Sequence, residues 1–218
     1  MRNPDPAAAF PAPSTARPRP RRHPVRETDR MRLFAAALPP ESAVEELAAR
    51  VRRLRQLPGA DRLRWTGRAG WHFTLAFYGE VPDAVLPELR ERLARAARRY
   101  EPIPLRLKGG GRLADRVVWA GADGGLPALR KLADSASAAA RRAGVEMSGH
   151  RAYTPHLTVA RNRGGALDLD PFVEALTDFE GGAWTVRELA LVRSRLPAGG
   201  VPGEQPRYET VAAWPLGR

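Results

Sequence analysis

The sequence predicts an α+β protein with two similar lobes, and three observations support that class. Apolar stripes typical of helices alternate along the chain with short apolar runs typical of strands. A unit of one strand, one helix and two strands occurs about twice. The pattern His, any residue, Thr, aliphatic residue also occurs twice, at residues 72–75 and 156–159. The two halves share too little sequence identity to establish a repeat by sequence alone.

The composition indicates one globular domain. The chain has 218 residues, 43% of them hydrophobic, which is enough for a sizeable core. No run approaches the roughly 18 apolar residues of a membrane span, and the N-terminus lacks an apolar signal core. The absence of cysteine excludes disulfides and thiolate metal sites. We therefore expect no membrane association and a cytoplasmic location.

The charge is strongly positive and unevenly distributed. The formal net charge is +12, of which residues 1–30 carry +4. A basic chain favours polyanionic partners such as nucleic acid. The alternative is a general preference for arginine, since Lys108 and Lys131 are the only lysines. Residues 1–30 are rich in Pro, Arg and Ala without an apolar period, so we predict a disordered tail there and a single folded domain over residues 31–218.

The first half of that domain predicts three strands and two helices. Apolar runs indicate strands at 31–38, 62–65 and 72–78, and helices are expected at 41–56 and 83–99. The stripe of the first helix consists of Val44, Leu47, Val51 and Leu54. The stripe of the second consists of Leu86, Leu89, Leu93 and Ala97. Spacings of three and four residues give each of these helices one apolar face.

The second half predicts two more helices and five strands. The helix at 125–143 repeats the apolar spacing and ends at Gly144. A short fourth helix has Asp170 as its N-cap and Pro171 at its first position, where a missing N–H is tolerated. The strands are expected at 103–108, 116–121, 156–161, 185–193 and 207–214. The glycine run at 108–112 lacks the spacing of a phosphate-binding loop and is interpreted as a turn or bulge.

The two His-x-Thr patterns place polar side chains on one face of each strand. Successive residues of a strand point to opposite faces, so His72 and Thr74 share a face, as do His156 and Thr158. The aliphatic residues between and after them face the core. One such strand from each lobe would bring two imidazoles and two hydroxyls around one cleft.

These groups suit phosphoryl chemistry. Histidine has an unperturbed pKa of about 6.5, so one ring can accept a proton while the other donates one. Threonine hydroxyls can bind phosphate oxygens, and the planar guanidinium of Arg161 can bind the same group. Arg161 is the third residue after Thr158, so its side chain lies on the opposite face of the strand unless the strand bends or ends there.

Other readings of these residues exist. A single His-x-Thr triplet is usually structural, but two of them use half of the four histidines. A metal site is disfavoured because no third ligand accompanies the pair. His23 and His150 have no partner pattern. Tyr153, just before the second motif, is the aromatic residue expected at the rim of a base-binding site.

The chain resembles the 2H phosphoesterases, and within them the bacterial RNA 2′,3′-cyclic phosphodiesterases, also called 2′-5′ RNA ligases. The resemblance runs from residue 31 to about residue 216. It is carried by residues 31–34 (MRLF), 38–40 (LPP), 64–65 (RW), 71–81 (WHFTLAFYGEV), 117–119 (VVW), 155–161 (PHLTVAR), 194–196 (SRL) and 207–209 (RYE). Tyr78 and Leu113 depart from residues common in the family, and residues 1–30 have no counterpart.

The resemblance implies a bilobal fold with an antiparallel sheet and helices in each lobe and the active site in the cleft between them. It also implies hydrolysis of RNA 2′,3′-cyclic phosphate ends to 2′-phosphates without a metal or cofactor. By the same resemblance His72 is the proton donor and His156 the acceptor, while Thr74, Thr158 and Arg161 bind the phosphate.

Three alternatives stay open from sequence. The substrate could be another small cyclic phosphodiester, or the enzyme could run the reverse reaction and join RNA ends. The chain could instead be a non-catalytic RNA-binding module, which fits its charge but leaves the duplicated motif unexplained. The expected partners are RNA ends or small cyclic-phosphate nucleotides, and the default expectation is a monomer. The natural RNA and the favoured reaction direction are not encoded in any recognisable pattern.

Overall fold

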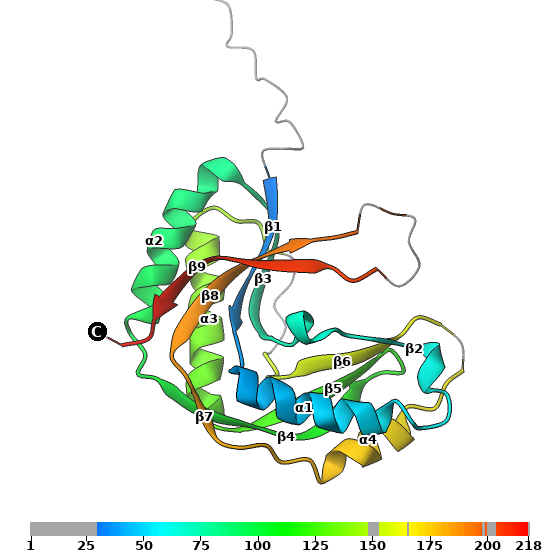
Figure 1. The fold of residues 1–218 in the computed structure, drawn as a ribbon. Helices are drawn as coiled ribbons and strands as arrows, with labels where there is room; N and C mark the ends of the chain where they lie inside the picture. Colours follow the sequence, from blue (N-terminus) through cyan, green and yellow to red (C-terminus); the bar gives the residue numbers. More distant parts are fainter. Residues whose placement is uncertain (1–29, 148–152, 165, 198, 200–203, 218) are drawn as a thin grey trace, which may run out of the picture.

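The strands of the protein form two antiparallel sheets (Figure 1). The computed structural model describes residues 30–147, 153–164, 166–197, 199 and 204–217. One sheet has the strand order β3-β1-β8-β9 and the other has the order β2-β6-β5-β4-β7. The strands are β1 (Arg30–Ala37), β2 (Leu63–Trp65), β3 (Phe73–Pro82), β4 (Ile103–Leu113), β5 (Val117–Gly124), β6 (Leu157–Asn162), β7 (Trp184–Val186), β8 (Glu188–Arg195) and β9 (Arg207–Pro215).

Two helices cover the outer face of each sheet. The helices are α1 (Glu41–Leu54), α2 (Leu86–Ala97), α3 (Leu126–Arg142) and α4 (Asp170–Thr177), with short 3-10 turns η2 (Ala60–Arg62), η3 (Arg68–Gly70) and η4 (Asp83–Val85). The four-stranded sheet packs against α2 and α3, and the five-stranded sheet packs against α1 and α4 (Figure 1). This arrangement confirms the α+β class and the two lobes. Among the described residues, no helix is long and apolar enough to cross a membrane.

The two lobes are interleaved along the chain. Helix α1 follows β1 of the four-stranded sheet but covers the five-stranded one, and α3 follows β5 of the five-stranded sheet but covers the four-stranded one (Figure 1). The last two strands, β8 and β9, return to the four-stranded sheet. Neither lobe is therefore a continuous segment of sequence.

The apolar residues of β1 are buried on both faces of the sheet. Leu33 and Ala35 belong to the main core beneath the helices. Phe34 and Ala36 point the other way and form a small second cluster with Ala190 and Val192 of β8. The alternation follows the period of two of a strand. This second cluster forms the floor of the inner face, which is the face that carries the first histidine motif.

Several boundaries differ from the sequence prediction. The first strand begins one residue earlier, at Arg30, and the expected strand at 185–193 is divided into β7 and β8. A bulge interrupts the pairing of β4 with β5 between Leu107 and Gly110, so the glycine run forms a bulge within one long strand, as predicted. The predicted tail lies outside the described residues except for Arg30, and so do His23 and His150.

The prediction that Asp170 caps the fourth helix was wrong. Asp170 is the first residue of α4, and Leu169 occupies the N-cap position without a side-chain cap bond. The Asp170 N–H instead donates to the carboxylate of Asp168 at 2.9 Å. The Asp170 carboxylate instead lies 2.9 Å from Nε of Arg112 in β4. The Asp170 carboxylate therefore forms an ion pair with a neighbouring strand instead of a cap bond, and this pair ties the helix to its sheet.

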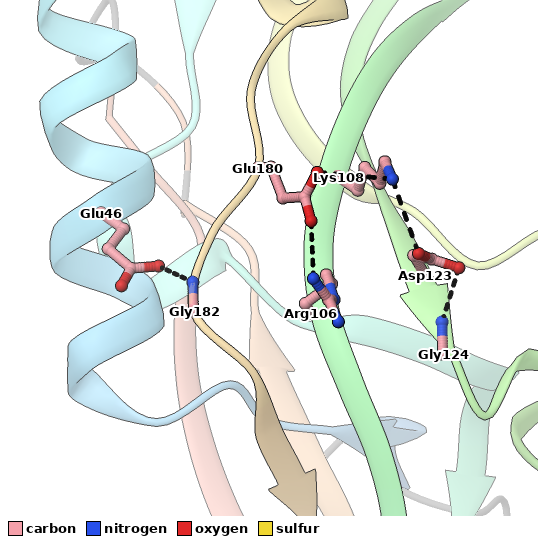
Figure 2. Close-up of polar contacts among 7 residues, drawn as sticks. All are labelled: Glu46, Arg106, Lys108, Asp123, Gly124, Glu180 and Gly182. Carbon is pink, nitrogen blue, oxygen red and sulfur yellow. Dashed lines mark hydrogen bonds and ion pairs between the residues drawn. The ribbon is translucent and has the colours of Figure 1, made fainter.

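A polar network fastens the segment after α4 to the five-stranded lobe (Figure 2). Glu180 accepts a hydrogen bond from Arg106 (2.6 Å) and lies 3.4 Å from the Lys108 ammonium group. Hydrogen bonds first from Arg106 and then from Lys108 lower the pKa of Glu180. The Gly182 N–H donates to Glu46 of α1 at 2.8 Å. None of these residues lines the cavity described below, and exposed ion pairs of this kind contribute little singly. The network therefore has a structural role.

Candidate active site

The two His-x-Thr motifs enter their strands in the same way. His72 immediately precedes β3 and His156 immediately precedes β6, so each histidine lies at the start of its strand instead of within it. The turn η3 before His72 is held to α1, because Arg68 donates to both carboxylate oxygens of Glu45. This contact fixes the segment that leads into the first motif.

Each motif strand contains a bulge directly after its threonine. In β3, Ala76 pairs with Ala35 and Thr74 pairs with Ala36, which leaves one extra residue, Leu75, between two consecutive pairs. Strand β6 repeats this pattern against β5, with Val159 as the extra residue between Ala160 and Thr158. The two lobes therefore share a local irregularity as well as a sequence motif, which supports their structural similarity.

The bulge decides the position of Arg161. In a regular strand Arg161 and Thr158 would point to opposite faces, but one extra residue reverses the alternation. Both side chains line the same cavity. The condition that the sequence left open, a bend in the strand, is therefore met. By the same argument Phe77 shares a face with Thr74 in β3.

A cavity of about 110 Å³ lies between the two lobes. Five of its lining residues were predicted from sequence: His72, Thr74, His156, Thr158 and Arg161. The others come mainly from the segment that contains β2 and from the start of β9, and they include Arg64, Trp65, Thr66, Gln205 and Tyr208. The cavity thus joins side chains that are far apart in sequence.

A hydrogen bond to the backbone defines which ring nitrogen of His156 is available to accept a proton. Its Nδ1 lies 2.7 Å from the carbonyl oxygen of Thr154, and a carbonyl can only accept, so Nδ1 carries the proton. The neutral ring then has its lone pair on Nε2. His156 is therefore arranged as a proton acceptor. The indole of Trp119 lies beside it, with ring centroids 6.1 Å apart.

His72 lies in a much less polar environment. Its ring is tilted against Phe34 at a centroid distance of 4.6 Å, and Tyr208 meets it edge-on at 5.1 Å. Burial lowers the pKa of His72 to about 4, because the charged imidazolium loses hydration. In the free cavity at neutral pH this ring is therefore uncharged.

Three arginines surround the region of Tyr208. Burial raises the pKa of the Tyr208 phenol, while the positive charges of Arg161, Arg64 and Arg32 oppose that rise. Arg64 and Arg161 are direct partners across the β2–β6 ladder. Like charges opposite each other on adjacent strands are destabilising unless something neutralises them. This pairing at a cavity wall is typical of a site that binds an anion.

The first residues of the segment that leads into β9 close one side of the cavity. The Arg64 guanidinium donates to the Glu204 carbonyl at 2.7 Å, and the Gln205 amide donates to the Trp65 carbonyl at 3.0 Å. Both bonds join residues 140 apart in sequence. Sequence reasoning gave no role to Arg64 or Tyr208, since neither lies in a repeated or periodic pattern; each occurs only within a short segment of family resemblance.

Tyr153 does not reach the cavity. It is half-buried against the main hydrophobic core, and burial raises the pKa of its phenol. Its position therefore gives no support to the expected role at a base-binding rim. Among the residues that the structure describes, no group of three or more His, Asp or Glu side chains could hold a metal ion.

Comparisons with known proteins agree with this architecture. The family model described as "2'-5' RNA ligase superfamily" matches residues 39–197. An RNA 2',3'-cyclic phosphodiesterase of Geobacillus stearothermophilus is 32% identical over 158 residues, which are 70% of this chain but only 47% of that protein. The chain therefore spans about half the length of this relative. A protein of the same name from Aeropyrum pernix is 35% identical over 150 residues, 66% of this chain and 82% of that protein.

Solved structures share the fold over nearly their full length. E. coli LigT complexed with 3'-AMP superimposes with a TM-score of 0.68 at 25% identity, covering 87% of this chain and 99% of that one. TT0787 of Thermus thermophilus gives 0.66 at 27% identity, covering 85% and 98%. With the family model matching most of the chain and both motifs lying within the matched residues, the chain belongs to the 2′-5′ RNA ligase superfamily, the group of 2H phosphoesterases that its sequence resembles.

Proposed function

We propose that the protein hydrolyses 2′,3′-cyclic phosphate ends of RNA to 2′-phosphates. The observation that carries this proposal is the convergence of two histidines and two threonines, one pair from each lobe, on one cavity beside Arg64 and Arg161. The names of the Geobacillus and Aeropyrum relatives support the substrate class, and the LigT structure complexed with 3'-AMP supports a nucleotide as ligand.

In the proposed reaction His156 activates water. Its Nε2 lone pair, left free by the Nδ1–H bond to Thr154, accepts a proton as the water oxygen attacks phosphorus. The bond between phosphorus and O3′ breaks on the opposite side. His72 donates a proton to O3′, and the product carries a 3′-hydroxyl and a 2′-phosphate. One water molecule is added in total, and both histidines regain their starting state by exchanging protons with solvent.

Thr74 and Thr158 would hold the phosphate between the two imidazoles. Each hydroxyl can donate to one non-bridging oxygen, and Arg161 can supply a charge-assisted bond to the same group. Arg64, directly opposite Arg161, adds to the positive potential. Binding a phosphate anion here would also relieve the repulsion between the two guanidinium groups.

The low pKa of His72 requires a source for the proton that it donates. Burial holds the free ring neutral, but a phosphate anion a few ångströms away favours the charged imidazolium. We propose that substrate binding raises the pKa of His72 and that the ring takes up its proton at that stage. The acid would then be formed only in the occupied cavity.

The product terminus tests the proposed function. Protein treated with EDTA is incubated with a short RNA that ends in a 2′,3′-cyclic phosphate, and the new end is identified by mass and by its resistance to a 3′-phosphatase. A 2′-phosphate is expected, because the proposed leaving group is O3′. A 3′-phosphate, an unchanged cyclic end, or activity lost to EDTA and restored by metal would contradict the proposal.

Joining of RNA ends is a second candidate, favoured by the name of the matching family. The same groups could serve with a 5′-hydroxyl in place of water: His156 accepts its proton as that oxygen attacks the phosphorus of the cyclic phosphate. The bond between phosphorus and O3′ breaks, His72 donates a proton to O3′, and a 2′-5′ phosphodiester is formed. The two reactions are separated by supplying an RNA with a 5′-hydroxyl at high concentration together with the cyclic-phosphate strand. A longer product containing a 2′-5′ bond would show ligation, and its absence would leave hydrolysis as the activity.

A further inference from the structure

Phe77 is an exposed aromatic ring in β3, the strand that begins after His72. Phe77 is 44% exposed, although its neighbours Ala76 and Tyr78 are buried. Phe77 pairs directly with Phe34 across the β1–β3 ladder, and Phe34 contacts the ring of His72. Directly paired residues point to the same face of a sheet. The Phe77 ring therefore lies on the inner face, one strand beyond Phe34.

Arg32 lies across this ring. Its Cζ is 4.6 Å from the Phe77 centroid, which is the geometry of a cation–π pair. Its only ion pair in the described chain is a long one, 4.0 Å to Glu80, and its side chain stays 35% exposed. The phenyl ring thus holds the guanidinium in place. The exposed side of the pair is open to a second flat group.

The pair is within reach of a nucleotide bound in the cavity. Phe77 is the third residue after Thr74, a span of roughly 10 Å along a strand. The charge of Arg32 also acts on Tyr208, which lines the cavity. This span is comparable with the distance from the phosphate of a nucleotide to the far edge of its base.

The two motifs have diverged at this position. Phe77 is the fifth residue after His72, and Arg161 is the fifth residue after His156. Both follow the same bulge and both point toward the inner face of their sheets. One lobe therefore offers a cation to the phosphate, while the other offers an aromatic ring topped by a guanidinium. Such asymmetry suits a ligand with an anionic end and a flat apolar end.

We infer that Arg32 and Phe77 form a stacking platform for the base of the terminal nucleotide. The inference rests on the proposed function, since it needs the phosphate of that nucleotide at the two histidines. Bases stack on arginine planes and aromatic rings whatever their identity. The platform offers a planar surface instead of a hydrogen-bond pattern, so it binds purines and pyrimidines alike.

The test compares a substrate with a base and one without. Adenosine 2′,3′-cyclic phosphate and glycerol 1,2-cyclic phosphate share the reacting ring but differ in the base. Arg32→Lys keeps the charge and removes the plane, and Phe77→Leu keeps an apolar side chain and removes the ring. Leu113→Ala, at a similarly exposed apolar residue of β4, is the matched control. Steady-state kcat and KM are measured for each variant, with thermal melting to verify folding.

The KM for the adenosine compound should rise on the order of 10-fold in both platform variants, with kcat close to the wild-type value. The KM for the glycerol compound should change far less. An equal loss with both substrates, or no loss with either, would overturn the inference.

If the wild-type protein hydrolyses neither compound, the proposed function fails. Calorimetry with adenosine 2′-monophosphate and with inorganic phosphate then tests the platform alone. Weaker binding of the nucleotide only would support it, and equal changes would refute it.

Discussion

The two histidines have opposite environments, although they occupy the same position in two copies of one motif. His156 donates a hydrogen bond from Nδ1 to the Thr154 carbonyl, and His72 is enclosed by Phe34 and Tyr208. The first contact fixes the tautomer, so that Nε2 is the acceptor nitrogen when the ring is neutral. The second depresses the pKa of its ring to about 4. These different surroundings support the proposed roles of His156 as base and His72 as acid.

The depressed pKa of His72 should rise when a phosphate binds. An anion near the ring stabilises the imidazolium, which opposes the effect of burial, so the pKa should move upward from about 4. The measurement is an NMR titration of the His72 ring, with and without saturating adenosine 2′-monophosphate. His72→Asn assigns the signal. An unchanged or lower value in the complex would contradict the proposal that substrate brings the proton to this ring.

Removing either threonine hydroxyl should weaken catalysis less than removing a histidine. Thr74→Val or Thr158→Val deletes one hydrogen bond to a charged phosphate, which corresponds to a loss on the order of 10-fold in kcat/KM. Thr74→Ser and Thr158→Ser keep the hydroxyl and serve as controls that should stay within a few-fold of wild type. If the valine variants match the wild-type rate, neither hydroxyl binds the phosphate.

Sequence could predict the motif residues that line the cavity but not all of their neighbours. His72, Thr74, His156 and Thr158 were identified because the motif is repeated and strand alternation places each pair on one face. Tyr208 lines the cavity because β9 pairs with β8 in the four-stranded sheet. This pairing joins distant parts of the fold and leaves no local pattern in the sequence. Tyr153 was expected near the base because of its position in sequence, whereas the structure packs it against the core.

At the scale of elements, the bulges decide which side chains meet. Long helices and strands were predicted well because their apolar periods are regular. The bulges at Leu75 and Val159 each add one residue to a strand, and no characteristic residue type marks them in the sequence. The sequence therefore could not show whether Thr158 and Arg161 share a face; it showed only that they would if the strand bent or ended there. The three-residue strand β7 was likewise merged with β8, because three residues are too short to show a period.

The glycine run in β4 should not tolerate a side chain. A Cβ on Gly110 would lie 2.6 Å from Cβ of Leu176 and 2.8 Å from the Trp119 carbonyl oxygen, and neither of these can move freely. Gly110→Ala should therefore lower the free energy of unfolding by about 1–3 kcal/mol. Gly67→Ala is the matched control, because no atom lies within 4 Å of a Cβ there. Urea denaturation measures both, and equal stability of the two variants would contradict the packing argument.

At the scale of the whole molecule, the interleaved connectivity couples the two lobes. Helices α1 and α3 each follow a strand of one sheet and cover the other, so neither lobe can form from a continuous segment. We propose that residues 31–218 behave as a single domain. Unfolding in urea should show one transition, with coincident curves from circular dichroism and tryptophan fluorescence. Two separate transitions would instead indicate independent lobes.

The positive charge should make longer RNA bind in a salt-dependent way. Contacts between arginines and phosphates release counterions, so affinity for an RNA of several nucleotides should fall as salt rises from low to physiological concentration. The formal charge of +12 includes arginines of the N-terminal segment, so a chain lacking residues 1–29 is measured in parallel. Both chains should hydrolyse a dinucleotide-sized substrate at similar rates. A flat salt response in both would favour a small-molecule substrate over RNA.

The central claim is that His72 and His156 act as one acid–base pair on the cyclic phosphate, and mutant kinetics test it most directly. Rates of hydrolysis of the cyclic-phosphate RNA are compared for wild type, His72→Ala, His156→Ala and the double variant, with RNA binding measured alongside. Each single change should lower kcat on the order of 10²- to 10⁴-fold while binding persists. The double change should cost less than the product of the single losses, because the pair acts as a unit. Full activity in either single variant would contradict the account.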